Sequence, residues 1–167
     1  VEEVYPVLLR GGKLAIAPRE EIIDTDALPA FILKHHITLI SCSPLLLNQL
    51  NMYKQIREAM GSIRIFISGG DVLKAGHVNR LLSLEWAKVY NTYGPTETTV
   101  CVTYYNIAKD TGTSIPIGTP IANYKVYILD RYHRLTAVGV PGQLCVAGPG
   151  VTRGYLNNPE LTADKYL

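Results

Sequence analysis

NTYGPTETT, residues 91–99, separates two apolar runs at residues 87–90 and 100–105. Gly94 and Pro95 stand at the centre of this stretch. Glycine can adopt backbone angles that are closed to other residues, and proline fixes φ near the value of a turn corner. We therefore expect the chain to bend or reverse direction between the two runs.

The side chains of the same stretch favour ligand binding. Tyr93 offers a flat ring with a polar tip, and Glu97 offers a hard oxygen ligand of the kind that Mg²⁺ prefers. Hydroxyl groups come from Thr96, Thr98 and Thr99. A planar ring, a phosphate and a cation could therefore bind here together. The alternative is a threonine-rich turn that only links two buried strands, because glycine, proline and threonine are ordinary loop residues.

Short apolar runs alternate with helical patterns before this stretch. We expect strands at residues 13–17, 37–41, 63–68 and 87–90. We expect helices at residues 2–10, 24–36, 44–53 and 72–82. Strands that are apolar throughout and alternate with helices are typical of a parallel sheet with helices on both faces. The sequence thus predicts an α/β fold that forms part of a doubly wound, mostly parallel sheet.

Polar and glycine-rich segments follow three of the expected strands, at residues 41–43, 68–71 and 91–97. In parallel sheets, ligands bind beyond the carboxyl ends of the strands. Three strand ends that converge on one edge are better evidence for a site than any single motif. We therefore expect the three segments to share a binding site.

The second half of the chain has a different pattern. Glycine and proline interrupt short alternating runs, notably residues 124–130 and 143–147, as in antiparallel strands and hairpins. We place a boundary within residues 108–117. Residues 1–110 would form an α/β subdomain that carries the site, and residues 111–167 an antiparallel, distorted barrel-like β subdomain. The alternative is that this second half is scaffold alone.

The chain ends and composition limit the class of protein. The first residue is Val1, within an amphipathic pattern, and residues 159–167 look like the start of a helix, so we expect an internal piece of a longer chain. With 167 residues, 47% apolar content and a net charge of +2, the chain is globular, and nothing suggests a nucleic-acid or membrane partner. Cys42, Cys101 and Cys145 are widely spaced, which favours reduced thiols and a cytoplasmic protein.

Residues 91–97, NTYGPTE, resemble the Asn-x-Tyr-Gly-Pro-Thr-Glu signature of amino-acid adenylation domains of nonribosomal peptide synthetases, in the adenylate-forming superfamily. The resemblance extends to FISGGDVL at residues 66–73, to residues 116–130, and to GQLCVAGPGVTRGYLNNPELT at residues 142–162. Gln143 and Thr152 depart from that family's usual Glu and Ala. The resemblance also implies that the phosphate loop, a ribose-binding Asp and a catalytic Lys lie outside these residues, so we expect weak ATP binding by the chain alone.

The resemblance implies an enzyme that joins an amino acid to ATP as an aminoacyl-AMP and then loads it as a thioester on the phosphopantetheine of a carrier domain. Glu97 would bind Mg²⁺ and Thr96 would contact the α-phosphate, and these are the catalytic residues. Tyr93 would stack on adenine and Asn91 would bind its exocyclic amine. The nucleotide-binding set is Gly69, Gly70, Asp71, Asn91, Thr92, Tyr93, Gly94 and Thr96.

The same resemblance implies a substrate pocket. Its lining would be Glu2, Ser41, Ile67, Gly69, Thr92, Val100 and Cys101. Most of these side chains are small or apolar, so the carboxylate of Glu2 predicts a substrate that brings a cation or a strong donor. We expect arginine or lysine, and the phenol of tyrosine could donate to the same carboxylate. The alternative for Glu2 is a solvated residue on the first turn of a helix.

Two other classes of function stay open. An acyl-CoA synthetase would keep the Tyr-Gly-x-Thr-Glu core of the motif but should lack an acidic pocket residue at Glu2. A non-catalytic binding module would fold and present a surface to a neighbouring domain without turnover.

Overall fold

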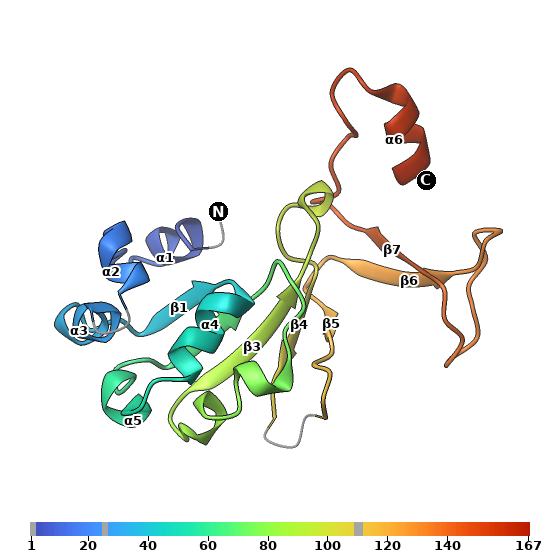
Figure 1. Ribbon diagram of the computed structural model, residues 1–167. Coiled ribbons are helices and arrows are strands. Elements are labelled where there is room, and N and C mark those ends of the chain that lie inside the picture. Colours follow the sequence, from blue (N-terminus) through green and yellow to red (C-terminus); the bar gives the residue numbers. More distant parts are fainter. Residues whose placement is uncertain (1–2, 25–26, 109–111) are drawn as a thin grey trace.

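The computed structural model describes residues 3–24, 27–108 and 112–167. Within these ranges the strands form a five-stranded sheet and a separate two-stranded sheet (Figure 1). The strands are β1 (Leu39–Cys42), β2 (Ile65–Ser68), β3 (Lys88–Tyr93), β4 (Thr103–Asn106), β5 (Thr119–Pro120), β6 (Lys125–Leu129) and β7 (Gln143–Ala147). The α-helices are α1 (Tyr5–Leu9), α2 (Arg19–Ile23), α3 (Ala27–Lys34), α4 (Pro44–Asn51), α5 (Ile56–Ala59) and α6 (Pro159–Lys165). The 3₁₀ helices are η1 (Ala75–His77), η2 (Leu81–Ser83) and η3 (Thr96–Thr98).

The larger sheet combines parallel and antiparallel strands in the order β1-β2-β3-β4-β5. β1, β2 and β3 run parallel, as the alternation of strands and helices predicted. β4 is antiparallel to β3, which confirms the reversal predicted at Gly94 and Pro95, and β5 is antiparallel to β4. The predicted α/β class is therefore confirmed, with a sheet that is parallel on one side of β3 and antiparallel on the other.

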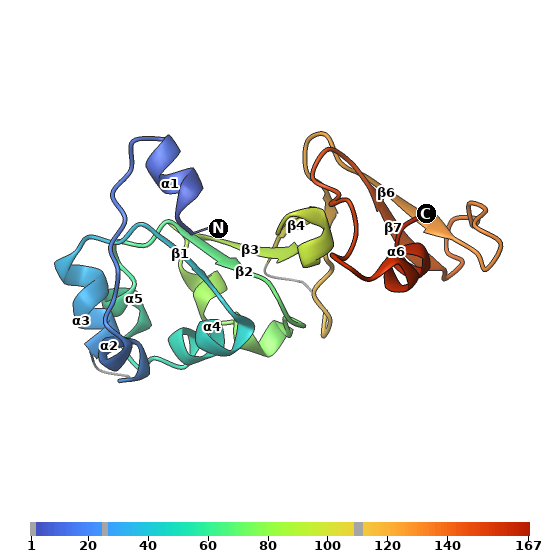
Figure 2. The ribbon, with the colours of Figure 1, turned by 90° about the horizontal axis from the view of Figure 1, so that it is seen from above.

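The parallel part of this sheet has one buried face. Along β2, Phe66 and Ser68 are buried, whereas Ile65 and Ile67 are half-buried. α3, α4 and α5 lie on one side of the parallel strands, and α1 lies on the other (Figure 2). α1 contributes no buried residue. The prediction that helices cover both faces is therefore not confirmed.

One predicted strand is wrong. Residues 13–17 form no strand, and the side chain of Ile16 is 82% exposed. A short apolar run becomes a strand only when a neighbouring strand accepts its backbone hydrogen bonds, and no described strand pairs with this segment. The local apolar pattern alone was therefore an insufficient signal here.

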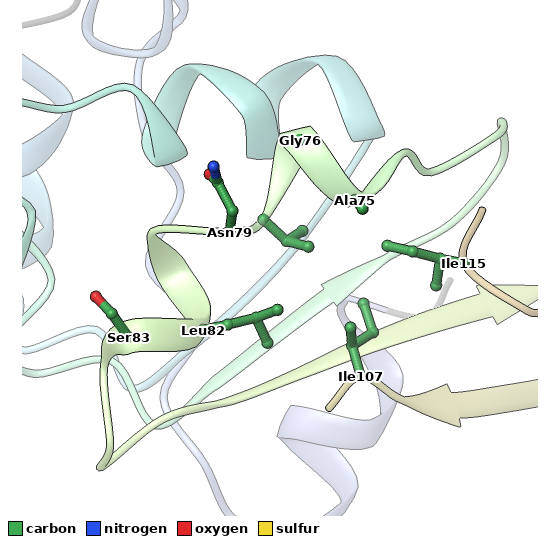
Figure 3. A pocket seen from close by; sticks show the side chains of 8 residues that line it. Ala75, Gly76, Asn79, Leu82, Ser83, Ile107 and Ile115 are labelled. Atoms are coloured by element: carbon green, nitrogen blue, oxygen red, sulfur yellow. The ribbon is translucent and has the colours of Figure 1, made fainter. Parts of the chain in front are cut away.

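The predicted helix at residues 72–82 is also wrong, because this segment forms η1 and η2 with an irregular link. Gly76 lies within it, and glycine lowers the stability of a continuous helix. A cavity of about 450 Å³ lies beside the segment, with Ala75 of η1 on one side and Ile107 and Ile115 on the other (Figure 3). No residue that the sequence predicted for the binding site lines this cavity.

Two helices escaped prediction because they are short. α2 has five residues and α5 has four, so neither presents a full period of the helical pattern. The predicted first helix exists as α1, with Pro6 in its first turn, where proline is tolerated. Among the described residues, no helix has the length and apolar character needed to cross a membrane.

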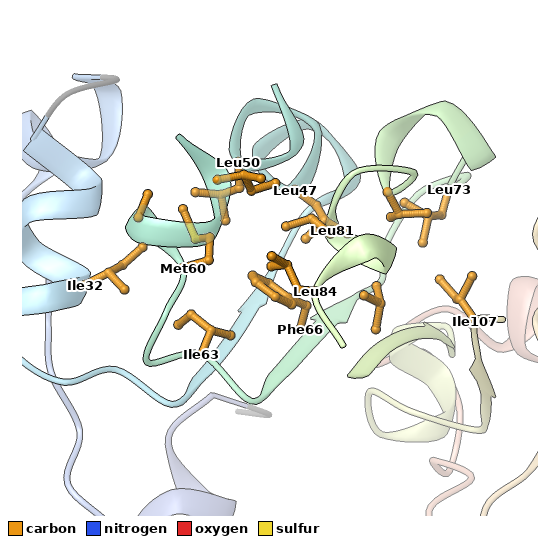
Figure 4. Close-up of a cluster of buried hydrophobic side chains, with 14 of the residues drawn as sticks. Ile32, Leu47, Leu50, Met60, Ile63, Phe66, Leu73, Leu81, Leu84 and Ile107 are labelled. Carbon is orange, nitrogen blue, oxygen red and sulfur yellow. The ribbon is translucent and has the colours of Figure 1, made fainter. Parts of the chain in front are cut away.

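The hydrophobic core lies between the parallel strands and the helices on their buried face. Phe66 of β2 and Val89 of β3 are at most 1% exposed and pack with side chains from the helices (Figure 4). The helices and loops contribute Ile32, Leu47, Leu50, Met60, Ile63, Leu73, Leu81 and Leu84. This core fixes the positions of β1, β2 and β3, and with them the edge at which the three strands end.

The cysteines are free thiols, as their spacing predicted. Burial, with the charge of Glu3 as a smaller cause, raises the pKa of the Cys42 thiol to about 12. A thiol with such a pKa stays protonated near neutral pH and is a poor nucleophile.

A buried asparagine holds the irregular segment between η1 and η2 on α4. The Asn51 side chain is 1% exposed, and its amide nitrogen donates to the Gly76 carbonyl at 2.9 Å and to Asn79 Oδ1 at 2.9 Å. Its oxygen accepts from the backbone N–H groups of Arg80, at 2.9 Å, and Leu81, at 3.2 Å. One side chain thus replaces the hydrogen bonds that a regular helix would have made.

Replacing Asn51 by Ala should lower the free energy of unfolding by about 3 kcal/mol, because the Leu81 N–H and the Gly76 carbonyl lose the partner that satisfies them. Chemical denaturation measures this change. Gln49→Ala, at an exposed position of the same helix, should stay within about 0.5 kcal/mol of the parent. Equal stabilities for the two variants would contradict this account of Asn51.

Candidate functional site

The carboxyl ends of β1, β2 and β3 lie at one edge of the sheet. Cys42 pairs in register with Ser68, and Ser68 with Asn91, in strands that run parallel. The segments that follow these residues therefore leave the sheet on the same side. This arrangement brings together the three segments that the sequence singled out. One of their residues has a structural role, because Ser43 Oγ caps α4 by accepting from Leu46 N.

Gly69 and Gly70 provide bare backbone at this edge. A Cβ at Gly69 would lie 2.5 Å from Thr92 Oγ1, so only glycine allows β2 to pass so close to β3. Gly70 has φ of 86°, and no heavy atom would lie within 4 Å of a Cβ built there. Open space thus adjoins the backbone of Gly70. Asp71 uses its carboxylate locally, because Oδ1 accepts from Val72 N at 2.7 Å.

Asn91 and Tyr93 occupy the last part of β3. Asn91 is 4% exposed and donates from its side-chain nitrogen to the Pro116 carbonyl at 2.9 Å. Its side-chain oxygen is thereby directed away from Pro116 and could accept from a ligand amine. Beside it in the sheet, Ser68 Oγ is buried without a hydrogen-bond partner among the described residues. Tyr93 is 36% exposed, so its ring is accessible.

The turn after β3 is unusually tight. A Cβ at Gly94 would lie 2.1 Å from the Val100 carbonyl oxygen, so no other residue fits. Thr99 and Val100 have φ of 57° and 73°, although β-branched residues rarely adopt left-handed backbone. Such strain persists only when surrounding contacts enforce it. The surrounding contacts come from the second half of the chain.

Residues of the second half hold this turn by hydrogen bonds. Tyr124 Oη donates to the Thr98 carbonyl at 2.8 Å, and Thr99 Oγ1 donates to the Gly150 carbonyl at 2.7 Å. The backbone N–H of Thr152 donates to the Glu97 carbonyl at 2.8 Å. We call these three hydrogen bonds, together with that between Tyr155 and Glu97, the turn contacts.

Glu97 is half-buried and accepts a short hydrogen bond at Oε1 from Tyr155 Oη. This bond, followed by a hydrogen bond from its own backbone, lowers the pKa of the Glu97 carboxyl. The same bond raises the pKa of the Tyr155 phenol to about 12. Glu97 is therefore held ionised, as a metal ligand must be. Thr96, on the same 3₁₀ helix, is exposed.

The residues predicted to line a substrate pocket are partly brought together. Ser41 of β1 is the register partner of Ile67 of β2, and Ile67 is the register partner of Tyr90 of β3. Because side chains alternate along a strand, Thr92 shares the face of Tyr90, which is the face opposite the core. The register thus places Ser41, Ile67 and Thr92 on one face of the sheet, and the substrate pocket stays a prediction.

The other predicted pocket residues lie apart from this face or outside the described residues. Val100 and Cys101 are half-buried in the turn between η3 and β4. Gly69 borders Thr92, as described above. Glu2 lies outside the described residues, so its place relative to Ser41 and Ile67 is not given by the structure.

The donor set suits magnesium bound together with phosphates. Within the described ranges, no three Asp, Glu, His or Cys residues cluster as an all-protein metal site would require. Mg²⁺ keeps several waters and commonly takes only one or two carboxylates plus substrate phosphates. Glu97, with one oxygen bound by Tyr155, fits the single-carboxylate arrangement.

Sequence reasoning missed Tyr155 and Tyr124 as contacts of the motif. Neither residue was assigned a role at the site, although Tyr155 stands within the stretch of residues 142–162 that carries the resemblance. Tyr155 lies 58 residues from Glu97 in the chain. No periodicity or spacing rule connects positions so far apart, and only the fold brings them together.

Replacing Glu97 by Gln should return the pKa of Tyr155 from about 12 toward its ordinary value near 10. The Tyr155–Glu97 bond stabilises the protein above the ordinary pKa of glutamate and below that of tyrosine. It is lost as pH falls through the lowered Glu97 pKa or rises through about 12. An NMR titration of ¹³Cζ-labelled tyrosine, with the Tyr155 signal assigned by Tyr155→Phe, measures the pKa. Glu160→Gln, at an exposed acid of α6, should leave it unchanged.

The sequence of the chain matches those of known proteins. A family model described as AMP-binding enzyme matches residues 1–156. Bacitracin synthase 2 of Bacillus licheniformis is 50% identical over 99% of the chain, which spans 6% of that relative. Tyrocidine synthase 3 of Brevibacillus parabrevis is 41% identical over 99% of the chain, and 2% of that relative is spanned. Gramicidin S synthase 2 of Brevibacillus brevis is 40% identical over 99% of the chain, and 4% of that relative is spanned.

These matches extend well beyond the motif of residues 91–97 and cover nearly all of both halves of the chain. They confirm the resemblance to adenylation domains that was drawn from the motif residues. The chain therefore belongs to the AMP-binding enzyme family.

Proposed function

We propose that this chain is part of the adenylation domain of a nonribosomal peptide synthetase. The full-length protein would use ATP to activate an amino acid as aminoacyl-AMP and then pass it to the phosphopantetheine thiol of a carrier domain. The observation that carries the proposal is the shared sheet edge at Ser68 and Asn91, in a chain that matches AMP-binding enzymes over residues 1–156. The names of the matched synthases support peptide synthesis as the context.

The chemistry joins two anions, so the site must position them and neutralise charge. The substrate carboxylate attacks the α-phosphorus of ATP, and pyrophosphate leaves. Adenine would lie along the bare backbone of Gly69 and Gly70, against the accessible ring of Tyr93, with Asn91 Oδ1 accepting from its amine. The exposed hydroxyl of Thr96 would contact the α-phosphate.

Magnesium would be held by Glu97. When bound, the ion supplies positive charge to the phosphate oxygens. The contribution of the chain is a carboxylate that is ionised and fixed in place by Tyr155. Asp71, Thr92 and Gly94 would complete the edge of the site through backbone shape, since Asp71 Oδ1 is already used by Val72 N.

The amino acid would bind on the sheet face opposite the core. Ser41, Ile67 and Thr92 share this face, and all are small or apolar. Val100 and Cys101 would close one end, and Glu2 would supply the carboxylate that selects a basic side chain. We propose arginine or lysine as the substrate, with tyrosine accepted through its phenol.

Glu97→Gln tests the metal role because glutamine keeps an oxygen that can accept from Tyr155 but has no charge. The rate of amino-acid-dependent pyrophosphate exchange by the full-length protein should fall by about 100-fold. The unfolding midpoint should change little. Glu85→Gln, at an exposed acid before β3, should leave the rate unchanged. Unchanged exchange in the Glu97 variant, with unfolding equal to the parent, would refute the assignment.

A panel of amino acids tests the substrate class. Exchange should be fastest with arginine, lysine or tyrosine, and Glu2→Gln should lower the rate with the basic substrates by at least about tenfold, because a charge-assisted hydrogen bond is lost. A preference for small acidic amino acids would eliminate this pocket. Exchange with fatty acids but with no amino acid would instead favour an acyl-CoA synthetase.

A further inference from the structure

We infer that Tyr155 is a positioning residue for Glu97, through which residues 150–166 control the metal-binding carboxylate. This inference rests on the proposed function and adds a residue to the machinery of the same site. The hydrogen bond from Tyr155 Oη engages Oε1 of Glu97. The carboxylate of Glu97 is thus held by the phenol of Tyr155 and by a hydrogen bond from its own backbone.

The backbone on both sides of this bond is also fixed. Thr152 N donates to the Glu97 carbonyl at 2.8 Å, so the segment that carries Tyr155 is tied to the residue that it contacts. Thr99 lies two residues after Glu97, and its Oγ1 donates to the Gly150 carbonyl at 2.7 Å. The segments that carry Tyr155 and Glu97 are therefore hydrogen-bonded to each other close to the contact between the two side chains.

Tyr155 is itself held by α6. Its backbone N–H donates to Thr162 Oγ1 at 2.9 Å, and its ring packs edge-on against Tyr166 with ring centroids 5.8 Å apart. The Tyr166 hydroxyl forms a hydrogen bond with Thr152 Oγ1. The family that residues 142–162 resemble usually has Ala where this chain has Thr152. The hydrogen bond to Tyr166 therefore depends on a hydroxyl that this usual residue lacks.

A fixed carboxylate favours metal binding. The hydrogen bond restricts the rotation of the Glu97 side chain, so less conformational entropy is lost when the metal binds. Loss of such a partner of a metal ligand usually lowers metal affinity or activity by 10- to 100-fold.

Tyr155→Phe removes the hydroxyl alone, and Tyr127→Phe, at an exposed position of β6 outside the turn contacts, is its matched control. In the full-length protein at fixed ATP, the Mg²⁺ concentration for half-maximal pyrophosphate exchange should rise by about tenfold or more in Tyr155→Phe. It should stay within about twofold of the parent in Tyr127→Phe.

A second readout is independent of turnover. In protein labelled with ¹³Cζ-tyrosine and mixed with ATP, the Tyr155 signal should shift when Mg²⁺ is added, because the metal draws charge from the carboxylate that accepts its hydrogen bond. The Tyr127 signal should stay in place. Thr152→Ala should leave the Tyr155 signal present but broaden it, because the contact to Tyr166 is lost.

The outcomes separate this inference from the proposed function. Equal Mg²⁺ dependence in Tyr155→Phe and the parent, or equal losses in both phenylalanine variants, would overturn the role of Tyr155. A Tyr155 signal that ignores Mg²⁺ would also overturn it. Absence of exchange by the parent with every amino acid would reject the proposed function, and the NMR comparison would still decide whether Tyr155 responds to a metal at Glu97.

Discussion

The close approach of Gly94 to the Val100 carbonyl is the constraint on which the rest of the site depends. A Cβ at position 94 would lie 2.1 Å from that oxygen, so the backbone can turn here only because the side chain is absent. The turn reverses the chain from β3 into β4 and places Thr99 and Val100 in left-handed backbone. Glu97 lies within this turn, as the middle residue of η3. Its orientation is thus a consequence of backbone packing before any ligand is considered.

β3 lies at the meeting point of two sheet architectures. On one side it pairs with β2 in parallel, and on the other with β4 in antiparallel fashion. Parallel pairing brings the ends of three strands to one edge of the sheet, next to the backbone of Gly69 and Gly70. Antiparallel pairing requires the chain to reverse immediately after β3. The ring of Tyr93 and the carboxylate of Glu97 therefore both lie in the short segment that ends β3 and makes this reversal.

The second half of the chain holds the turn that carries Glu97. Its residues supply all four turn contacts, through Tyr124, Gly150, Thr152 and Tyr155. The strained turn would otherwise relax, since β-branched residues in left-handed backbone cost free energy that neighbouring contacts must offset. Tyr155 contacts α6 through its backbone N–H and Glu97 through its hydroxyl, so it joins the last described helix to the turn. The division between residues 110 and 111 stays a prediction. β5 lies after this division but pairs with β4, which lies before it.

The sequence by itself determined the parallel strands, the reversal at Gly94 and Pro95, the convergence of three segments on one edge, and the family. These features depend on local composition and on a contiguous motif, which can be seen without long-range contacts. Tertiary structure decided the rest. Residues 72–82 became irregular because Asn51, more than twenty residues earlier, binds their backbone, and residues 13–17 found no strand to pair with. Tyr155 forms a hydrogen bond with Glu97 across 58 residues of sequence, because such a bond depends on distance in space and not on separation along the chain.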